Sequence, residues 1–178
     1  TWPCSITEME PNDGMTQVYR DMILWADIIL VATPIRWGNA SSLYFKMAER
    51  LNCVQNQITM KDRVLVKNKV ASFIITGGQD NIQQVAGQMM VFFTDLGFTF
   101  PPFSFLGWSR GWTAEDMDKN ILQFKKSEYV NRTAKELVDN CVNTLQSIKQ
   151  MDVSKLKAPK PHKEDSLSFG MDNPDMNL

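Results

Sequence analysis

Cysteine and histidine are scarce in this sequence. Its 178 residues include three cysteines and one histidine. Cys4, Cys53 and Cys141 form an odd set without Cys-x-x-Cys spacing, which argues against a disulfide framework and against a self-contained metal site. The histidine, His162, lies in a polar tail. We therefore expect reduced thiols, no metal and no catalytic histidine.

Long hydrophobic runs and an excess of either charge are also missing. No apolar run approaches the roughly 20 residues that cross a bilayer, and no signal-peptide pattern opens the sequence. The formal net charge is -1, and the basic residues are spread out, which gives no electrostatic reason to bind nucleic acid. With 43% hydrophobic residues the chain can bury a real core. We expect a cytoplasmic protein with neither nucleic-acid nor membrane partners.

Two apolar runs predict buried strands. Residues 28–32, "IILVA", are apolar without alternation, and Pro34 ends the run because it lacks a backbone donor and biases Thr33 away from helix. A second run extends from Val70 to Thr76. Strands that are apolar on both sides are typical of parallel α/β sheets, in which ligands bind beyond the carboxyl ends of the strands.

A third, weaker strand is expected within residues 98–108, "FTFPPFSFLGW". Pro101 and Pro102 cannot donate to a strand ladder, so this strand is placed at a sheet edge. Helical spacing predicts helices over residues 15–25, 42–54, 82–96 and 130–148. The alternation of helix and strand predicts an α/β fold with a right-handed, doubly wound parallel sheet.

The sequence also predicts the capping residues of two of these helices and the apolar face of one. Asn39, Ser41 or Ser42 is expected to cap the helix over 42–54, and Asp80 or Asn81 the helix over 82–96, which Gly97 ends. The apolar face of the first helix is expected to carry Leu43, Met47, Leu51 and Val54.

The segment "ADIILVATPIRWGNASSLYFKMAERL" resembles the flavin-loop segment of the NAD(P)H-dependent FMN reductase and quinone reductase group, within the flavodoxin-like superfamily. In that group a buried strand leads through Thr/Ser-Pro, an aromatic residue and a glycine into a helix with Lys and then Asp-Arg or a variant. The matching residues here are Thr33, Pro34, Trp37, Gly38, Lys46 and Arg50, with Glu49 where the family often has Asp. "TGGQDN", residues 76–81, resembles the second flavin loop of the family.

The resemblance implies FMN as cofactor and NAD(P)H as co-substrate. Glycine lets backbone N–H groups approach the flavin ring closely, and helix N-termini favour the negative charge of the reduced ring. Because the cofactor carries the chemistry, no catalytic side chain is expected. The expected cofactor-binding residues are Thr33, Pro34, Ile35, Arg36, Trp37, Gly38, Asn39, Gly77, Gly78, Gln79, Asp80 and Trp112.

Several of these residues have alternative explanations. Trp37 either contacts the flavin or packs against a helix, and Arg36 either attracts NADPH phosphates or is simply solvated. Trp108 and Trp112 flank the flavin, close a dimer contact or pack in the core. Lys46 and Arg50, four residues apart, are interpreted as a solvated helix face.

The front of the chain departs from the resemblance. A flavodoxin-like domain begins with a strand, a Ser/Thr-rich phosphate loop, a helix and a second strand, and none of these precedes "TWPCSITEMEPNDGM". We expect the chain to be a fragment of a longer protein; the alternative is a sheet whose missing centre is supplied by a partner. The strands present would be the third, fourth and fifth in the order 2-1-3-4-5, which leaves one edge of the first exposed.

The sequence therefore predicts two regions. Residues 1–151 form a flavodoxin-like FMN-binding domain that is incomplete at its N-terminal side, and residues 152–178 form a polar extension that packs on the body or on a neighbouring subunit. The predicted activity is hydride transfer from NAD(P)H to a flavin, quinone or similar small acceptor. A flavodoxin-like electron carrier or a non-catalytic flavin-binding module is the alternative. A homodimer or homotetramer is expected, because five tryptophans and eleven methionines exceed what three helical faces and a short sheet need.

Overall fold

The computed structural model of the chain describes residues 6–77, 81–109 and 118–151. Gly78, Gln79, Asp80, Trp112 and the predicted extension 152–178 lie outside these residues. Every helix within the described ranges is too short or too polar to cross a bilayer.

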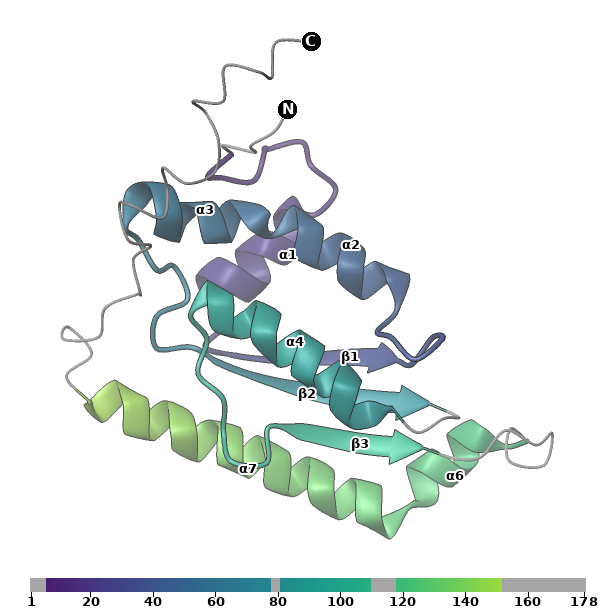
Figure 1. Ribbon diagram of the computed structural model, residues 1–178. Coiled ribbons are helices and arrows are strands. Elements are labelled where there is room, and N and C mark those ends of the chain that lie inside the picture. Colours follow the sequence, from purple (N-terminus) through teal and green to yellow (C-terminus); the bar gives the residue numbers. More distant parts are fainter. Residues whose placement is uncertain (1–5, 78–80, 110–117, 152–178) are drawn as a thin grey trace, which may run out of the picture.

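Three parallel strands form the sheet of the described residues. They are β1 (Ile28–Pro34), β2 (Val70–Gly77) and β3 (Phe105–Ser109), in the order β1-β2-β3. In the register, Ile29 pairs with Ala71, and Ile74 with Leu106. The parallel sheet and the edge position of the third strand are as predicted, and all three strands end at the same rim (Figure 1).

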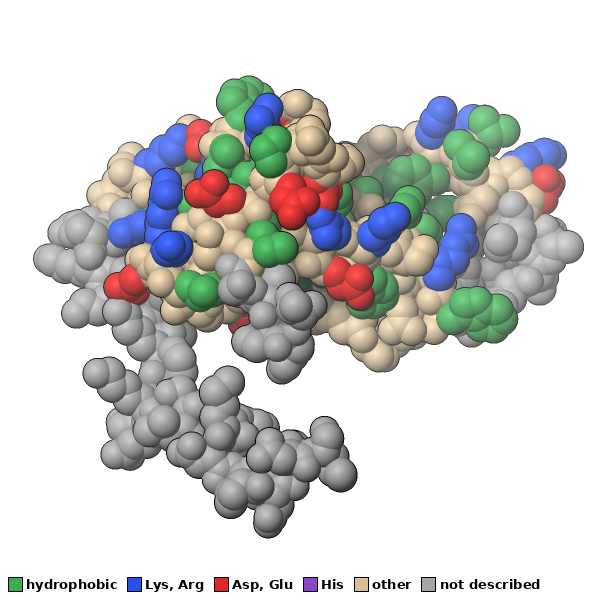
Figure 2. Space-filling view, turned by 90° about the horizontal axis from the view of Figure 1, so that it is seen from above, with side chains coloured by type: hydrophobic (Ala, Val, Ile, Leu, Met, Phe, Trp, Pro, Cys, Tyr) green, Lys and Arg blue, Asp and Glu red, His purple; other side chains and the backbone are tan. Residues whose placement is uncertain are grey.

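Helices cover the two faces of this sheet in separate layers (Figure 1). One face carries the N-terminal helices, the pair α2 and α3, and α4, while α7 crosses the other face and α6 lies near the end of β3. The bounds are α1 Thr16–Tyr19, the π-helix η1 Arg20–Trp25, α2 Ser42–Arg50, α3 Asn52–Lys61, α4 Ile82–Leu96, α6 Asn120–Lys126 and α7 Glu128–Gln150. On the face in Figure 2, acidic and basic side chains are interspersed.

The main core lies between β2 and α4. Phe73 on β2 and Phe93 on α4 are fully buried, with ring centroids 5.4 Å apart. A smaller cluster on the other face joins Leu106 of β3 to Val130 and Leu137 of α7. These contacts fix the sheet between two layers, as the apolar runs predict.

β1 is covered less completely than β2. Its other edge has no partner strand among the described residues, and Leu30 is 43% exposed. An apolar groove of about 400 Å³ follows this strand, lined by Asp21, Met22, Trp25, Ala26, Ile28, Ile29, Leu30, Val31, Ala32 and Met47. This is the exposed edge that the sequence predicts for the first strand of the chain.

Three sequence expectations need correction. The third strand begins at Phe105, because the segment before it contains Pro101 and Pro102 and contributes only an isolated bridge from Thr99 to Val70. The helix expected over 42–54 is divided at Leu51 into α2 and α3. Leu43 is 76% exposed, and its neighbour Tyr44 takes the buried place on the apolar face.

The helix expected over 15–25 is correct in extent but not in its period. From Arg20 onward it is a π-helix, whose wider turn rotates the following side chains away from the 3.6-residue pattern. Ile23 is therefore fully buried while Trp25 is 82% exposed. At the C-terminal end of η1 the Lys69 ammonium donates to the carbonyl oxygens of Ala26 at 2.6 Å and Leu24 at 3.3 Å. Burial lowers the pKa of Lys69.

Candidate functional site

The two predicted flavin loops follow neighbouring strands at one rim of the sheet. Residues 35–41 connect β1 to α2, and Asn81 precedes α4 after the end of β2. In Figure 1 the first loop extends beyond the tip of the β1 arrow, next to the tip of the β2 arrow. A ligand at this rim would face the N-termini of two helices, which favour negative charge.

The tip of the first loop is a tight turn. Arg36 and Asn39 exchange two backbone hydrogen bonds, of 2.7 and 3.0 Å. Between them Trp37 has φ 50° and Gly38 has φ 75°, the pair of positive φ values that a type I′ turn requires. Glycine is suited to this conformation, whereas a tryptophan in it is a strained exception.

Three of the predicted binding residues, Thr33, Pro34 and Ile35, hold the start of the loop in place. The Thr33 hydroxyl is buried; it accepts a hydrogen bond from the Ser41 N–H at 3.0 Å and donates to the Pro34 carbonyl at 3.1 Å. Ile35 is buried as well, and its N–H donates to the Thr76 carbonyl at 2.7 Å. These residues position the turn, while their own polar groups are engaged within the protein.

The second loop is fastened to the first by two contacts. The Asn81 side-chain amide donates to the Gly38 carbonyl at 2.5 Å. A Cβ at Gly77 would lie 2.9 Å from the Cβ of Ile35, so this glycine is needed for the packing of one loop against the other. Asn81 occupies the N-cap position of α4, as one of the two expected caps, but its side chain makes no capping hydrogen bond there. Ser41 caps α2 by accepting from the Tyr44 N–H at 3.4 Å.

The exposed part of the site is a tryptophan with backbone donors beside it. Trp37 is 96% exposed, and Arg36 and Asn39 are exposed next to it. Within the described residues the N–H groups of Trp37 and Gly38 have no hydrogen-bond partner, whereas the N–H of Asn39 is used in the turn. An indole face and two free donors fit the ring of a flavin, which needs an apolar wall and donors for its oxygens.

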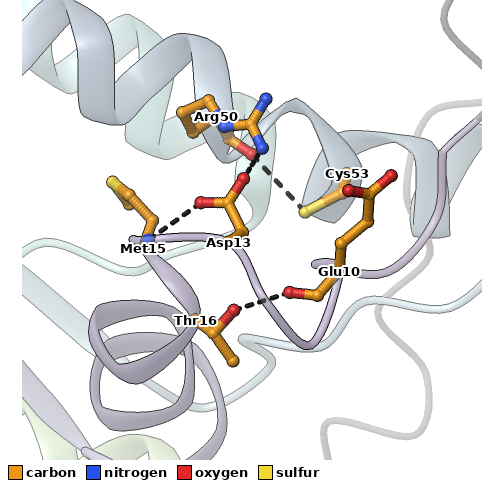
Figure 3. Close-up of polar contacts among 6 residues, drawn as sticks. All are labelled: Glu10, Asp13, Met15, Thr16, Arg50 and Cys53. Atoms are coloured by element: carbon orange, nitrogen blue, oxygen red, sulfur yellow. Dashed lines mark hydrogen bonds and ion pairs between the residues drawn. The ribbon is translucent and has the colours of Figure 1, made fainter.

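Arg50, which matches the arginine of the family motif, lies away from this rim. Figure 3 shows its guanidinium paired with the Asp13 carboxylate, which also accepts from the Met15 N–H at 2.8 Å. The Cys53 thiol donates to the Arg50 carbonyl at 3.6 Å. Arg50 therefore ties the segment before α1 to the end of α2, a role that the spacing of Lys46 and Arg50 did not reveal.

The sequence interpretation also missed Asn81 as the tie between the loops. The available signal was an amide directly after the second glycine loop, but a residue in that place is commonly a helix cap, and the chain gives no hint of the distance to Gly38. No cluster of three or more potential metal ligands occurs within residues 6–77, 81–109 and 118–151.

Comparison with known proteins identifies the family. The sequence matches the profile of NADPH-dependent FMN reductases over residues 3–113, which is more than half of its length and includes all the predicted site residues. The chain belongs to this family. Membership in the NADPH-dependent FMN reductase family supports a flavin-associated enzyme of the oxidoreductase type.

Two curated proteins are similar to this family member over part of their lengths. One is the 8-demethyl-8-aminoriboflavin-5'-phosphate synthase of Streptomyces davaonensis, 30% identical over 83 residues, or 47% of this chain and 32% of that protein. The other is the divalent metal cation transporter MntH of Mycobacterium bovis, 26% identical over 107 residues, or 60% of this chain and 16% of that protein. The chain thus spans a third or less of the length of these relatives.

A solved structure supports the fold of this family member. The crystal structure of RosB with bound 8-demethyl-8-formylriboflavin-5'-phosphate superimposes with a TM-score of 0.66 at 17% identity, covering 94% of this chain and 69% of that one. At this identity the likeness concerns the fold alone. The arrangement of strands and layers is flavodoxin-like, as the sequence predicts.

Proposed function

We propose that this chain is the flavin-binding part of an FMN-dependent oxidoreductase that passes a hydride from NAD(P)H to a flavin, a quinone or a similar small acceptor. Family membership supports the flavin, and a relative whose name concerns a riboflavin phosphate, the 30% identical synthase, supports the same class of ligand.

The observation that carries the proposal is the state of Trp37. Its backbone has a positive φ that costs a bulky residue of the order of 1–3 kcal/mol, and its side chain is 96% exposed. Neither feature stabilises the free chain, so both point to a ligand that covers the indole. A flat aromatic ring at the carboxyl ends of β1 and β2 fits that place.

Each residue of the two loops would have its own role in binding the cofactor and the co-substrate. Trp37 provides a wall for the ring, and the free N–H groups of Trp37 and Gly38 donate to its oxygens. Asn81 holds the second loop against the first, so that the wall keeps its position. The exposed guanidinium of Arg36 attracts the phosphates of NADPH. FMN, when bound, supplies the acceptance and donation of hydride, so that no side chain has to act as acid or base.

FMN titration tests the site with two matched tryptophan variants. We expect Trp37→Ala to weaken FMN binding about tenfold or more, because stacking on an exposed aromatic side chain contributes roughly 1–3 kcal/mol. Trp25→Ala is the control, since Trp25 is also 82% exposed but precedes β1 at the opposite end of the strand. Gly38→Val should weaken binding as well, because its φ of 75° strains a branched residue and its Cβ would lie 3.0 Å from the Asn81 amide nitrogen.

Equal FMN affinities for Trp37→Ala, Trp25→Ala and the unchanged chain would contradict the site. The reaction is tested separately, by adding NADPH or NADH to the FMN-loaded chain without oxygen. We expect the flavin absorbance to bleach. Colour that persists would contradict the reductase and favour the electron-carrier alternative.

A further inference from the structure

A cavity lies at the same rim as the two loops, beyond the end of β3. It has a volume of about 530 Å³, which is within the range of small-molecule sites, and it lies between the end of β3, α6 and the start of α7. Its lining residues are Trp108, Lys119, Leu122, Gln123, Lys126 and Ser127. In Figure 1, α6 is next to the tip of the β3 arrow, and at this end Figure 2 shows a hollow with hydrophobic side chains in it.

The walls of this cavity combine an aromatic face with positive charge. Trp108 is half-buried, and its indole is held edge-on against the Phe124 ring at a centroid distance of 5.3 Å. Lys119 and Lys126, at opposite ends of α6, add two ammonium groups, and no carboxylate is among the described lining residues. An indole held in place beside two cations suits an aromatic ligand with negative charge.

Among the described residues, two acidic ones lie close to the cavity, and neither removes this bias. Asp118 is 3.8 Å from the Lys119 ammonium in an exposed pair, which is weak in water. Glu128 is in the first turn of α7, after the Ser127 hydroxyl that accepts from the Val130 N–H at 3.2 Å. The N-terminus of the 23-residue helix α7 also favours an anion beside Ser127.

We infer that the cavity formed by Trp108, Lys119, Gln123 and Lys126 binds a phosphate-bearing aromatic ligand, stacked on Trp108 with its phosphate between the two lysines. Such a ligand has two sources, the adenosine phosphate half of a dinucleotide and a flavin phosphate that arrives as acceptor. The dinucleotide source rests on the proposed function, whereas the site itself does not need FMN in the loops of β1 and β2.

Calorimetric titration of the chain without added flavin tests the site. The probes are adenosine 2′,5′-bisphosphate, FMN, adenosine and inorganic phosphate. We expect at least one of the first two to bind at least tenfold more tightly than adenosine and than inorganic phosphate, with an affinity that falls as salt is added. The double variant Lys119→Gln, Lys126→Gln should weaken that binding about tenfold. Lys125→Gln, on the same helix but outside the lining, should change it less than twofold.

The same titrations, repeated on the variants, distinguish the two ligand sources and the two binding sites. Binding of adenosine bisphosphate that is lost in the lysine double variant and kept in Trp37→Ala indicates the dinucleotide. FMN binding with that dependence indicates the flavin phosphate, whereas FMN binding lost only in Trp37→Ala belongs to the β1 loop. The inference is overturned if neither phosphorylated probe binds in a lysine-dependent way, or if Lys125→Gln weakens binding as much as the double variant. Trp108→Phe keeps an aromatic face and should retain binding, and complete loss there in a folded protein would also overturn it.

Discussion

At the scale of single residues, Tyr44 is a buried aromatic residue whose hydroxyl lacks a hydrogen-bond partner within the described part of the chain. The residue is only 6% exposed, its ring lies 5.5 Å from that of Phe45 and 6.4 Å from that of Phe92, and its hydroxyl has no hydrogen-bond partner among the described residues. Burial raises the pKa of Tyr44 from 10.0 to about 12. The hydroxyl therefore contributes nothing to stability that an aromatic ring alone would not contribute.

Tyr44→Phe should leave the free energy of unfolding within about 1 kcal/mol of the original at pH 7, or raise it, because an unpaired hydroxyl is removed. At higher pH the unfolded tyrosine loses its proton near pH 10 and the folded one near 12, so this group costs stability as the pH rises through that interval. We expect urea denaturation at pH 7 and pH 11 to show a smaller alkaline loss in the variant. Tyr19, whose pKa is also raised by burial, remains in both proteins. An identical alkaline loss would contradict this account.

At the scale of elements, α4 shows how far local pattern determines a helix. Its buried residues Val85, Met89, Phe93 and Leu96 recur at helical spacing, and Gly97 ends it with φ 97°. Gly87 is a remaining weakness, since it is exposed in the middle of the helix and nothing lies within 4 Å of the position of a Cβ there. No neighbouring atom of the described residues requires a glycine at position 87.

Gly87→Ala is expected to raise the free energy of unfolding by about 0.5–1 kcal/mol, because alanine loses less backbone freedom when the helix forms. Gly107→Ala on β3 is the opposite case, since its Cβ would lie 2.6 Å from the Cγ2 of Ile82. We expect that variant to be destabilised. Urea denaturation of both proteins checks the contrast, and a lower stability of Gly87→Ala would show that α4 depends on this glycine after all.

At the scale of the whole molecule, the uncovered side of β1 is the feature that most needs explanation. Trp25 is exposed and lines the same groove as the exposed Leu30, and the groove along the strand is lined mainly by apolar residues. Large exposed apolar patches tend to become interfaces, and an unpaired strand edge favours association. We propose that the chain as given forms a homodimer or homotetramer that covers this side of β1, the place that the expected missing strand would take in a longer protein.

Leu30→Lys should shift the chain toward the monomer, because it places a charge in the groove. Leu43→Lys is the matched control, since Leu43 is 76% exposed on α2 and does not line that groove. Light scattering over micromolar concentrations measures the difference. A monomeric original chain that still binds FMN, or equal association of the two variants, would refute the proposal.

Local sequence patterns were sufficient to predict two strands, the end of one helix and the position of the first loop. Unbroken apolar runs predicted β1 and β2, and Gly97 marked the end of α4. The Thr-Pro-x-x-Trp-Gly motif pointed to the loop that the family match includes. These features depend on neighbours a few residues apart, where backbone sterics and hydrophobic period act directly.

The roles of the individual residues in these parts followed from how the elements pack against one another. The motif could not show that Thr33 and Ile35 are buried supports while Trp37 stands exposed, nor that Asn81 reaches the Gly38 carbonyl. Likewise, the π-turn that exposes Trp25 and the cavity that joins Trp108 to Lys119 and Lys126 bring together groups far apart or out of period in the chain. The physical reason is that burial and hydrogen-bond partners are set by packing between elements, which local propensity does not contain.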